Sequence, residues 1–195
     1  MREIIWSKFL TINSLIILIA FSVITKGQLP AKKTWSYELK SITSETSDTE
    51  KLKVHLEIQR ISRGVFAISG TVLFNYDVAE GDSNMISAKS YRSAQGDNDY
   101  KVLPFQMPAT HFFKVLNTHY KDVIMDTLKD CSDFPVFEDK FVPPLEKKLY
   151  TLDSCQFSQD GLPNHLQDGF YKLLIIGSGD ADWKVEIIAE VTQEL

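Results

Sequence analysis

The side chains best suited to metal chemistry are two histidines in the stretch Thr110 to Cys131. His111 and His119 lie on one predicted helix, where a spacing of eight positions separates them by roughly 80° around the axis. No glutamate stands between them at the spacing of a zinc protease. The pattern therefore indicates surface histidines, and we expect no metal site.

Two further groups could be read as catalytic, and each has a simpler interpretation. Gly177-Ser178-Gly179 lies between two strand patterns, which favours a hairpin turn over a nucleophile elbow. Asp133, Glu138 and Asp139 share a loop with Lys140, which indicates solvated charges rather than an acid pair. We therefore expect neither an enzyme nor a bound cofactor.

The chain has two cysteines, Cys131 and Cys155. An even pair in an oxidising compartment favours one disulfide, and closing a loop of this length would stabilise the fold by roughly 3 kcal/mol. Two buried free thiols are the alternative. A nucleophilic role for Cys131 is less consistent with a paired cysteine in a secreted chain.

The first 27 residues have the pattern of a cleaved secretory signal peptide. Arg2 and Lys8 form a basic region, an apolar run centred on residues 15–21 follows, and small residues suited to cleavage come next. Asn13 and Ser14 interrupt the run, which leaves it short of the ~20 apolar residues that a membrane span needs. An uncleaved anchor is the alternative. We expect residues 28–195 to form a single secreted domain with no stable membrane span.

Composition limits the class of partner. The 195 residues are 44% hydrophobic, which suits a globular domain, and the formal net charge is -5. An acidic balance argues against nucleic acid or an anionic membrane surface as a charge-driven partner.

Most of the remaining chain alternates between apolar and polar residues, which predicts half-buried strands. The predicted strands cover residues 35–42, 52–59, 65–78, 85–93, 100–105, 148–157, 170–176 and 183–191. The weak alternation of residues 85–93 suits an edge strand or a cavity rim. About seven or eight such strands with one inserted helix indicate a mainly β protein, an antiparallel cup or sandwich.

Thr110 to Cys131 is the strongest helical pattern, with Thr110 as its predicted N-cap. One face of the helical wheel carries Phe112, Phe113, Leu116, Tyr120, Val123, Ile124 and Cys131. Val115, Met125 and Leu128 fall outside that arc. A single aromatic-rich helix among strands must lie against a sheet.

Aromatic residues are concentrated around this helix and the loops at its ends. The set comprises Phe105, Phe112, Phe113, Tyr120, Phe134, Phe137 and Phe141. They predict either a large aromatic core under a long loop or an apolar cavity with loops at its mouth. Periodicity alone leaves both interpretations open.

The second half of the chain resembles the insect chemosensory protein B family. The residues that carry the resemblance are Phe134-Pro-Val-Phe-Glu-Asp-Lys-Phe-Val-Pro-Pro-Leu145, Tyr150, Cys155, Asp160-Gly-Leu-Pro163 and Asp168-Gly-Phe-Tyr171, with the helix before them. Members are similar to the ganglioside GM2 activator protein, a lipid-binding β-cup with a deep apolar cavity. That protein has several disulfides, whereas this chain can form only one.

The resemblance implies a protein of the sensillum lymph that binds lipid-like or hydrocarbon ligands and modulates gustatory detection of pheromones. The candidate cavity residues are Phe112, Phe113, Leu116, Tyr120, Phe74 and Phe137. We expect Phe112 and Phe113 to face an interior void. Two alternatives are a lymph protein that acts on a chemosensory receptor or ion channel, and a cofactor that extracts lipids for a hydrolase.

Overall fold

The computed structural model describes residues 33–157 and 162–194. The predicted signal peptide and the Asp160-Gly161 pair lie outside the described residues. Contacts divide the chain after Lys33, and the unit that begins at Thr34 contains every element described below. No helix in the described part of the chain is long and apolar enough to cross a bilayer.

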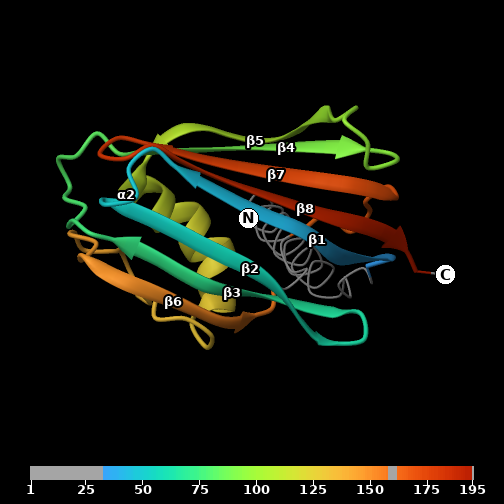
Figure 1. Ribbon diagram of the computed structural model, residues 1–195, viewed down its shortest axis with the longest axis horizontal. Helices are drawn as coiled ribbons and strands as arrows, with labels where there is room; N and C mark the ends of the chain where they lie inside the picture. The colour runs from blue at the N-terminus through green and yellow to red at the C-terminus, as the bar shows by residue number, and fades with distance from the viewer. Residues whose placement is uncertain (1–32, 158–161, 195) are drawn as a thin grey trace, which may run out of the picture. The chain divides into compact units, whose positions relative to one another are not determined.

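The described residues form eight antiparallel strands in two sheets, with one continuous helix of three segments between β5 and β6 (Figure 1). The strands are β1 (Trp35–Thr46), β2 (Leu52–Ser62), β3 (Val65–Phe74), β4 (Met85–Ser93), β5 (Lys101–His111), β6 (Lys148–Cys155), β7 (Gly169–Ser178) and β8 (Trp183–Gln193). The larger sheet has the order β1-β8-β7-β4-β5, and the smaller one the order β2-β3-β6. The predicted mainly β, antiparallel fold is confirmed.

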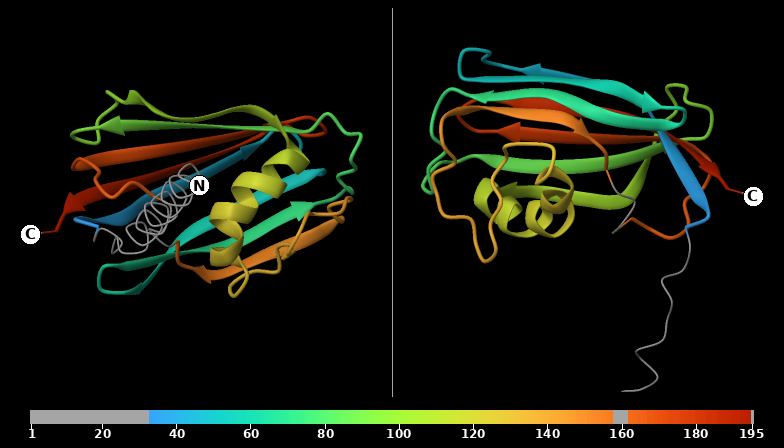
Figure 2. Two further views of the ribbon diagram at one scale, coloured as in Figure 1. Left: turned by 180° about the vertical axis from the view of Figure 1, so that it is seen from behind. Right: turned by 90° about the horizontal axis from the view of Figure 1, so that it is seen from below.

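The helix consists of three segments that follow one another without a break. They are α2 (Phe112–Val115), the π-helical η1 (Leu116–Ile124) and α3 (Met125–Leu128). Seen from below, both sheets lie on one side and the helix lies against their common face (Figure 2). Leu52, Phe74 and Tyr150 of the smaller sheet share a hydrophobic cluster with the buried helix residues.

Three predictions about this region need correction. β5 does not end at Phe105 but continues through Pro104 and Pro108 to His111, because an edge strand can place proline nitrogens on its unpaired side. Thr110 belongs to β5 and pairs with Ile86 of β4, so Thr110 is not the helix N-cap. β4 is not an edge strand, since it pairs with both β5 and β7.

The helical wheel was wrong for its C-terminal half. Val123 was predicted to be buried but is 54% exposed, whereas Leu128, outside the predicted arc, is 6% exposed. The π-helical segment winds with i→i+5 hydrogen bonds, so residues after Leu116 rotate away from the positions that 100° per residue assigns.

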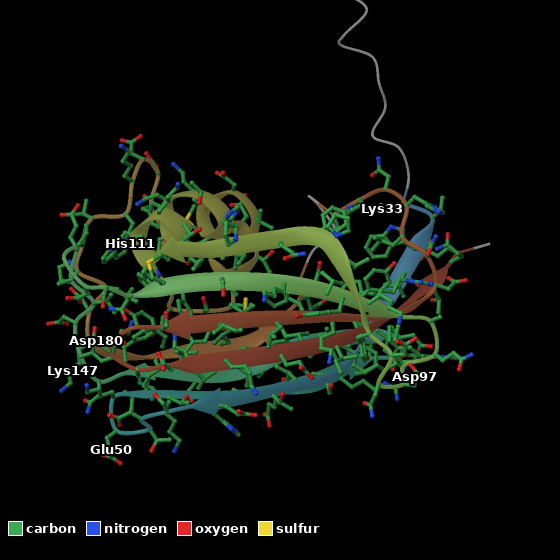
Figure 3. The ribbon with its side chains drawn as sticks, turned by 90° about the horizontal axis from the view of Figure 1, so that it is seen from above. Lys33, Glu50, Asp97, His111, Lys147 and Asp180 are labelled. Atoms are coloured by element: carbon green, nitrogen blue, oxygen red, sulfur yellow. A yellow bond between two sulfur atoms is a disulfide. The ribbon has the colours of Figure 1, made fainter. Side chains whose placement is uncertain are left out.

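Asn84 connects the helix to the sheet at one end. Its carbonyl accepts a hydrogen bond from the Phe112 N–H (2.9 Å), and its Nδ2 donates to Oδ2 of Asp180 (2.9 Å) in the turn between β7 and β8. His111 and Asp180 lie at this end, whereas Asp97 lies at the opposite end in the β4–β5 turn (Figure 3). The Gly177-Ser178-Gly179 stretch closes the β7–β8 hairpin, as predicted.

Candidate ligand-binding site

The structure brings the six predicted cavity residues together where the helix meets the sheet. Phe112, Phe113, Leu116, Tyr120 and Phe74 are buried in one cluster, and Phe137 packs against it. Phe112 meets the ring of Phe113 edge-on with a centroid distance of 5.5 Å and that of Phe74 at 6.4 Å. These rings cover one another as a packed core does. A void beside Phe112 and Phe113, and a ligand role for the six, stay predictions.

The aromatic loop between the helix and β6 is fastened to the helix by polar contacts. Tyr120 donates its hydroxyl to the carbonyl of Pro135 (2.7 Å), and burial, with a smaller contribution from Tyr150, raises the pKa of Tyr120 to about 12. Asn117 accepts from the Phe141 N–H (2.7 Å), and Lys121 donates to carbonyls of the loop. Phe141 also stacks on Phe113 at 5.7 Å. The loop is therefore held as part of the helical side of the domain.

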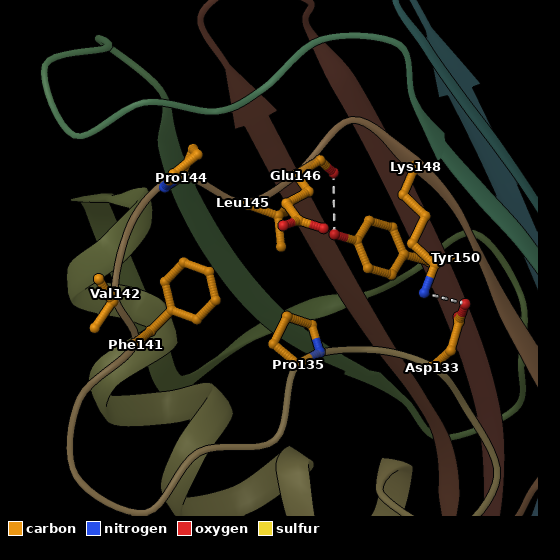
Figure 4. Close-up of a pocket in the computed structure, with 9 residues that line it drawn as sticks. All are labelled: Asp133, Pro135, Phe141, Val142, Pro144, Leu145, Glu146, Lys148 and Tyr150. Atoms are coloured by element: carbon orange, nitrogen blue, oxygen red, sulfur yellow. Dashed lines mark hydrogen bonds and ion pairs between the residues drawn. The ribbon is translucent and has the colours of Figure 1, made fainter.

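A surface pocket of about 320 Å³ lies between this loop and the start of β6 (Figure 4). Its lining consists of Asp133, Pro135, Phe141, Val142, Pro144, Leu145, Glu146, Lys148 and Tyr150. None of the six predicted cavity residues lines it, although Phe141 and Tyr150 contact Phe113 and Phe74 on the other side. Tyr150 donates its hydroxyl to the Glu146 carbonyl (3.0 Å), so the polar end of its ring is already satisfied.

The pocket wall contains one ion pair. Lys148 Nζ lies 2.7 Å from Oδ2 of Asp133, and the Thr151 N–H donates to Oδ1 of Asp133 at 2.6 Å. Partial burial raises the pKa of Asp133, but the hydrogen bonds from Lys148 and Thr151 outweigh it, so the pKa lies below its ordinary value. The Asp133 carboxylate and the Lys148 ammonium are thus paired with each other, and the carboxylate is also hydrogen-bonded to β6.

We expect Lys148→Met to raise the pKa of Asp133, because the variant removes the larger hydrogen bond and the cation together. Since the folded-state pKa is depressed, this carboxylate stabilises the fold above its unfolded pKa, and the contribution is lost as the pH falls through the folded pKa. Carboxyl carbon NMR titration of Asp133 measures the shift directly. Lys147→Met, at an exposed neighbour, is the matched control and should leave the Asp133 titration unchanged.

A second apolar surface lies on the larger sheet and was not singled out from the sequence. Strand register places Leu173 beside Ile187 and Ile175 beside Val185 on the same face as Ile86 and Trp183. Ile86 and Trp183 pack against the cluster under the helix, which shows that this face turns toward the helix. We call it the concave face.

The opposite face of the same strands is charged. Lys172 pairs with Glu186 (3.6 Å), Lys184 with Glu45 (2.9 Å), and Lys40 with Glu190 (2.8 Å). Residues of one strand alternate between faces, so these ion pairs lie on the outer face, together with apolar residues such as Ile176. The alternation of residues 183–191 contained this signal, but the neighbouring strands had to be known before it became a surface.

The far end of the concave face is crossed by the segment that leads into β7. Trp35, only 1% exposed, donates its indole N–H to the Pro163 carbonyl (3.0 Å), and Gln193 Nε2 donates to the Leu166 carbonyl (2.5 Å). Between this segment and the helix, Leu173 remains 39% exposed, and Ile175 and Ile187 are half-buried. Among the described residues these three are not members of the cluster beneath the helix.

The fold and this surface together define an antiparallel β-cup, whose apolar inner face is covered by a helix at one end. Residues 86–173, from β4 into β7, match the family model described as a protein of unknown function (DUF1091). The match includes the helix, the aromatic loop and both cysteines. No curated protein matches the chain.

Proposed function

We propose that this chain is a secreted binding protein for lipid-like or hydrocarbon ligands, with no catalytic activity of its own. The observation that carries the proposal is the partly exposed apolar strip of Leu173, Ile175 and Ile187 on the concave face. Exposed contiguous apolar surface in a small domain is typical of a ligand or partner site. An alkyl chain laid along it would gain about 0.8 kcal/mol for each CH₂ removed from water.

The biological setting of the proposal comes from the resemblance to the insect chemosensory protein B family and the ganglioside GM2 activator protein. The residues that carry this resemblance lie largely inside the segment that the family model matches. The disulfide between Cys131 and Cys155 supports an oxidising compartment such as the sensillum lymph. In that setting the protein would present pheromone-like hydrocarbons or lipids to gustatory neurons.

Two apolar residues of equal size on β7 provide a matched test of the binding surface. Leu173 is 39% exposed on the concave face, and Ile176 is 36% exposed on the charged face. We expect Leu173→Asp to weaken the binding of cetyl alcohol by about tenfold or more, because a carboxylate then borders the alkyl chain. Ile176→Asp should change the affinity by less than about twofold. Titration of each purified protein, monitored by displacement of a fluorescent fatty-chain probe, measures both.

Equal affinities in the two variants would exclude the concave face as the binding surface. If the folded wild-type protein bound none of cetyl alcohol, n-hexadecane and palmitic acid, the carrier function itself would be wrong. That result would favour the alternative of a lymph protein that acts on a receptor or ion channel. Circular dichroism of all three proteins controls for loss of the β structure.

A further inference from the structure

One cation interrupts the concave face. The register of β1, β4, β7 and β8 assigns to this face Trp35, Tyr37, Leu39, Ile42, Ser44, Thr46, Ile86, Ala88, Ser90, Arg92, Gly169, Tyr171, Leu173, Ile175, Gly177, Trp183, Val185, Ile187, Ala189, Val191 and Gln193. Arg92 is the only charged residue in that set. Within these four strands the cation therefore stands among uncharged residues, where an unpaired charge needs a specific partner.

Arg92 is not neutralised by the described part of the chain. Its Nη2 donates to the backbone carbonyl of Asp168, but its Nε is buried and has no hydrogen-bond partner among the described residues. The Asp168 carboxylate instead accepts from the Gln193 N–H (2.7 Å). Lys101, across from Arg92 on the edge strand β5, pairs with Asp99 (2.6 Å) and adds no negative charge to the face.

A buried donor without an acceptor is uncommon, because such a group loses its hydrogen bond to water and gains nothing in return. A guanidinium has five N–H donors arranged in a plane that matches the two oxygens of a carboxylate. Arg92 is thus chemically suited to the anionic oxygens of a ligand that lies on this face.

The apolar strip begins directly beside Arg92. Arg92 pairs with Tyr171, and the next pair on the same face is Ser90 with Leu173, followed by Ala88 with Ile175 and Ile86 with Gly177. The six residue steps from Arg92 to Ile86 span about 20 Å at the rise of a β-strand, which is the length of a long acyl chain. The strip ends at Ile86, which packs against the cluster under the helix.

We propose that the concave face binds single-chain amphiphiles with a carboxylate head, such as long-chain fatty acids. The carboxylate accepts hydrogen bonds from Arg92, and the chain lies along Leu173 and Ile175 toward the helix. The inference rests on the proposed carrier function and narrows its ligand class. It distinguishes fatty acids from hydrocarbons and alcohols, which have no anionic oxygen to offer Arg92.

The test compares three ligands of equal chain length, palmitic acid, cetyl alcohol and n-hexadecane, on the purified wild-type protein and three variants. Arg92→Met keeps the length and the apolar stem of the side chain but removes its donors. Lys89→Met removes a cation from the charged face of the same strand and is the matched control. Arg92→Lys keeps the charge and loses the planar fork.

We expect Arg92→Met to weaken palmitic acid binding by about tenfold or more while the affinity for cetyl alcohol changes by less than about twofold. Arg92→Lys should fall between wild type and Arg92→Met, and Lys89→Met should match wild type. Thermal melts of the unliganded proteins establish that each variant is folded.

An unchanged palmitic acid affinity in folded Arg92→Met would overturn the head-group assignment, as would wild-type protein that binds the alcohol or the hydrocarbon but not the acid. Either result leaves the carrier function intact. Failure of the wild-type protein to bind any of the three ligands would instead overturn both proposals.

Discussion

Replacing Phe74 by alanine is expected to lower the free energy of unfolding by about 3–5 kcal/mol, the cost of deleting a well-packed core phenylalanine. Phe74 is 7% exposed and lies at the centre of the aromatic cluster. Its ring centroid is 6.1 Å from that of Tyr76, 6.4 Å from Phe112 and 6.0 Å from Tyr150. Alanine at this position would leave the three rings without their common neighbour. Urea denaturation followed by circular dichroism measures the loss.

Phe105→Ala is the matched control, because the Phe105 side chain is 60% exposed on the edge strand β5. A change of less than about 0.5 kcal/mol is expected there. A cost below about 1 kcal/mol for Phe74→Ala would contradict the packed-core interpretation. It would mean that the ring borders open space, as the predicted cavity beneath the helix requires.

The strands could be predicted because each has one solvent-exposed and one buried face. β4 was predicted with its observed bounds, and β2 and β8 were predicted to within a few residues. A glycine within β3 can mark a close backbone approach, and at Gly70 an added Cβ would lie 2.1 Å from the His55 carbonyl oxygen. Period-2 burial is a local property, so the local sequence is sufficient to find it.

Sheet position and helix winding could not be obtained in this way. The predicted strand over residues 100–105 stopped before Pro108, and only the pairing with β4 shows that the edge strand continues to His111. The π-helical segment moved Val123 into solvent, a change that no 100° wheel can predict. In both cases long-range packing decided the outcome.

The candidate site also has one part that the local sequence predicted and one part that it did not. The six aromatic and aliphatic residues around the helix were predicted as a group, and the structure brings them together in one cluster. Arg92 was missed, although a basic residue in phase with Ile86 and Ala88 was a detectable signal. Its significance depends on the register of β4 with β7, which places it at the end of the Leu173–Ile175 strip.

The disulfide offers the second large effect. Cys131, just beyond the helix, is bonded to the fully buried Cys155 at the end of β6, with a Cα–Cα distance of 5.3 Å. The predicted pairing is confirmed, and the alternative of free thiols is wrong. Nearby backbone hydrogen bonds add to the attachment, since the Asp153 N–H donates to the Cys131 carbonyl (2.8 Å). One corner of the domain thus depends on a covalent bond and a few hydrogen bonds.

We expect Cys131→Ser to lower the free energy of unfolding by about 3 kcal/mol, because the unfolded chain is no longer restricted by the loop between the two cysteines. We also expect the loss to be uneven. Amide hydrogen exchange should accelerate first in the last helical turn and the segment around Ser132, while the amides of β7 and β8 stay protected. Hydrogen exchange with mass spectrometry resolves the two regions.

The double variant Cys131→Ser/Cys155→Ser distinguishes the loss of the disulfide from any effect of an unpaired Cys155 thiol. Its stability should match that of the single variant. If β7 and β8 lost protection together with the helix end, the domain would unfold in one step. The helix would then belong to the core and would not act as a separate wall of the cup. A local opening would instead show that the helical end can loosen while the concave face of the larger sheet remains intact. A carrier needs that property to admit a long alkyl chain at the boundary between them.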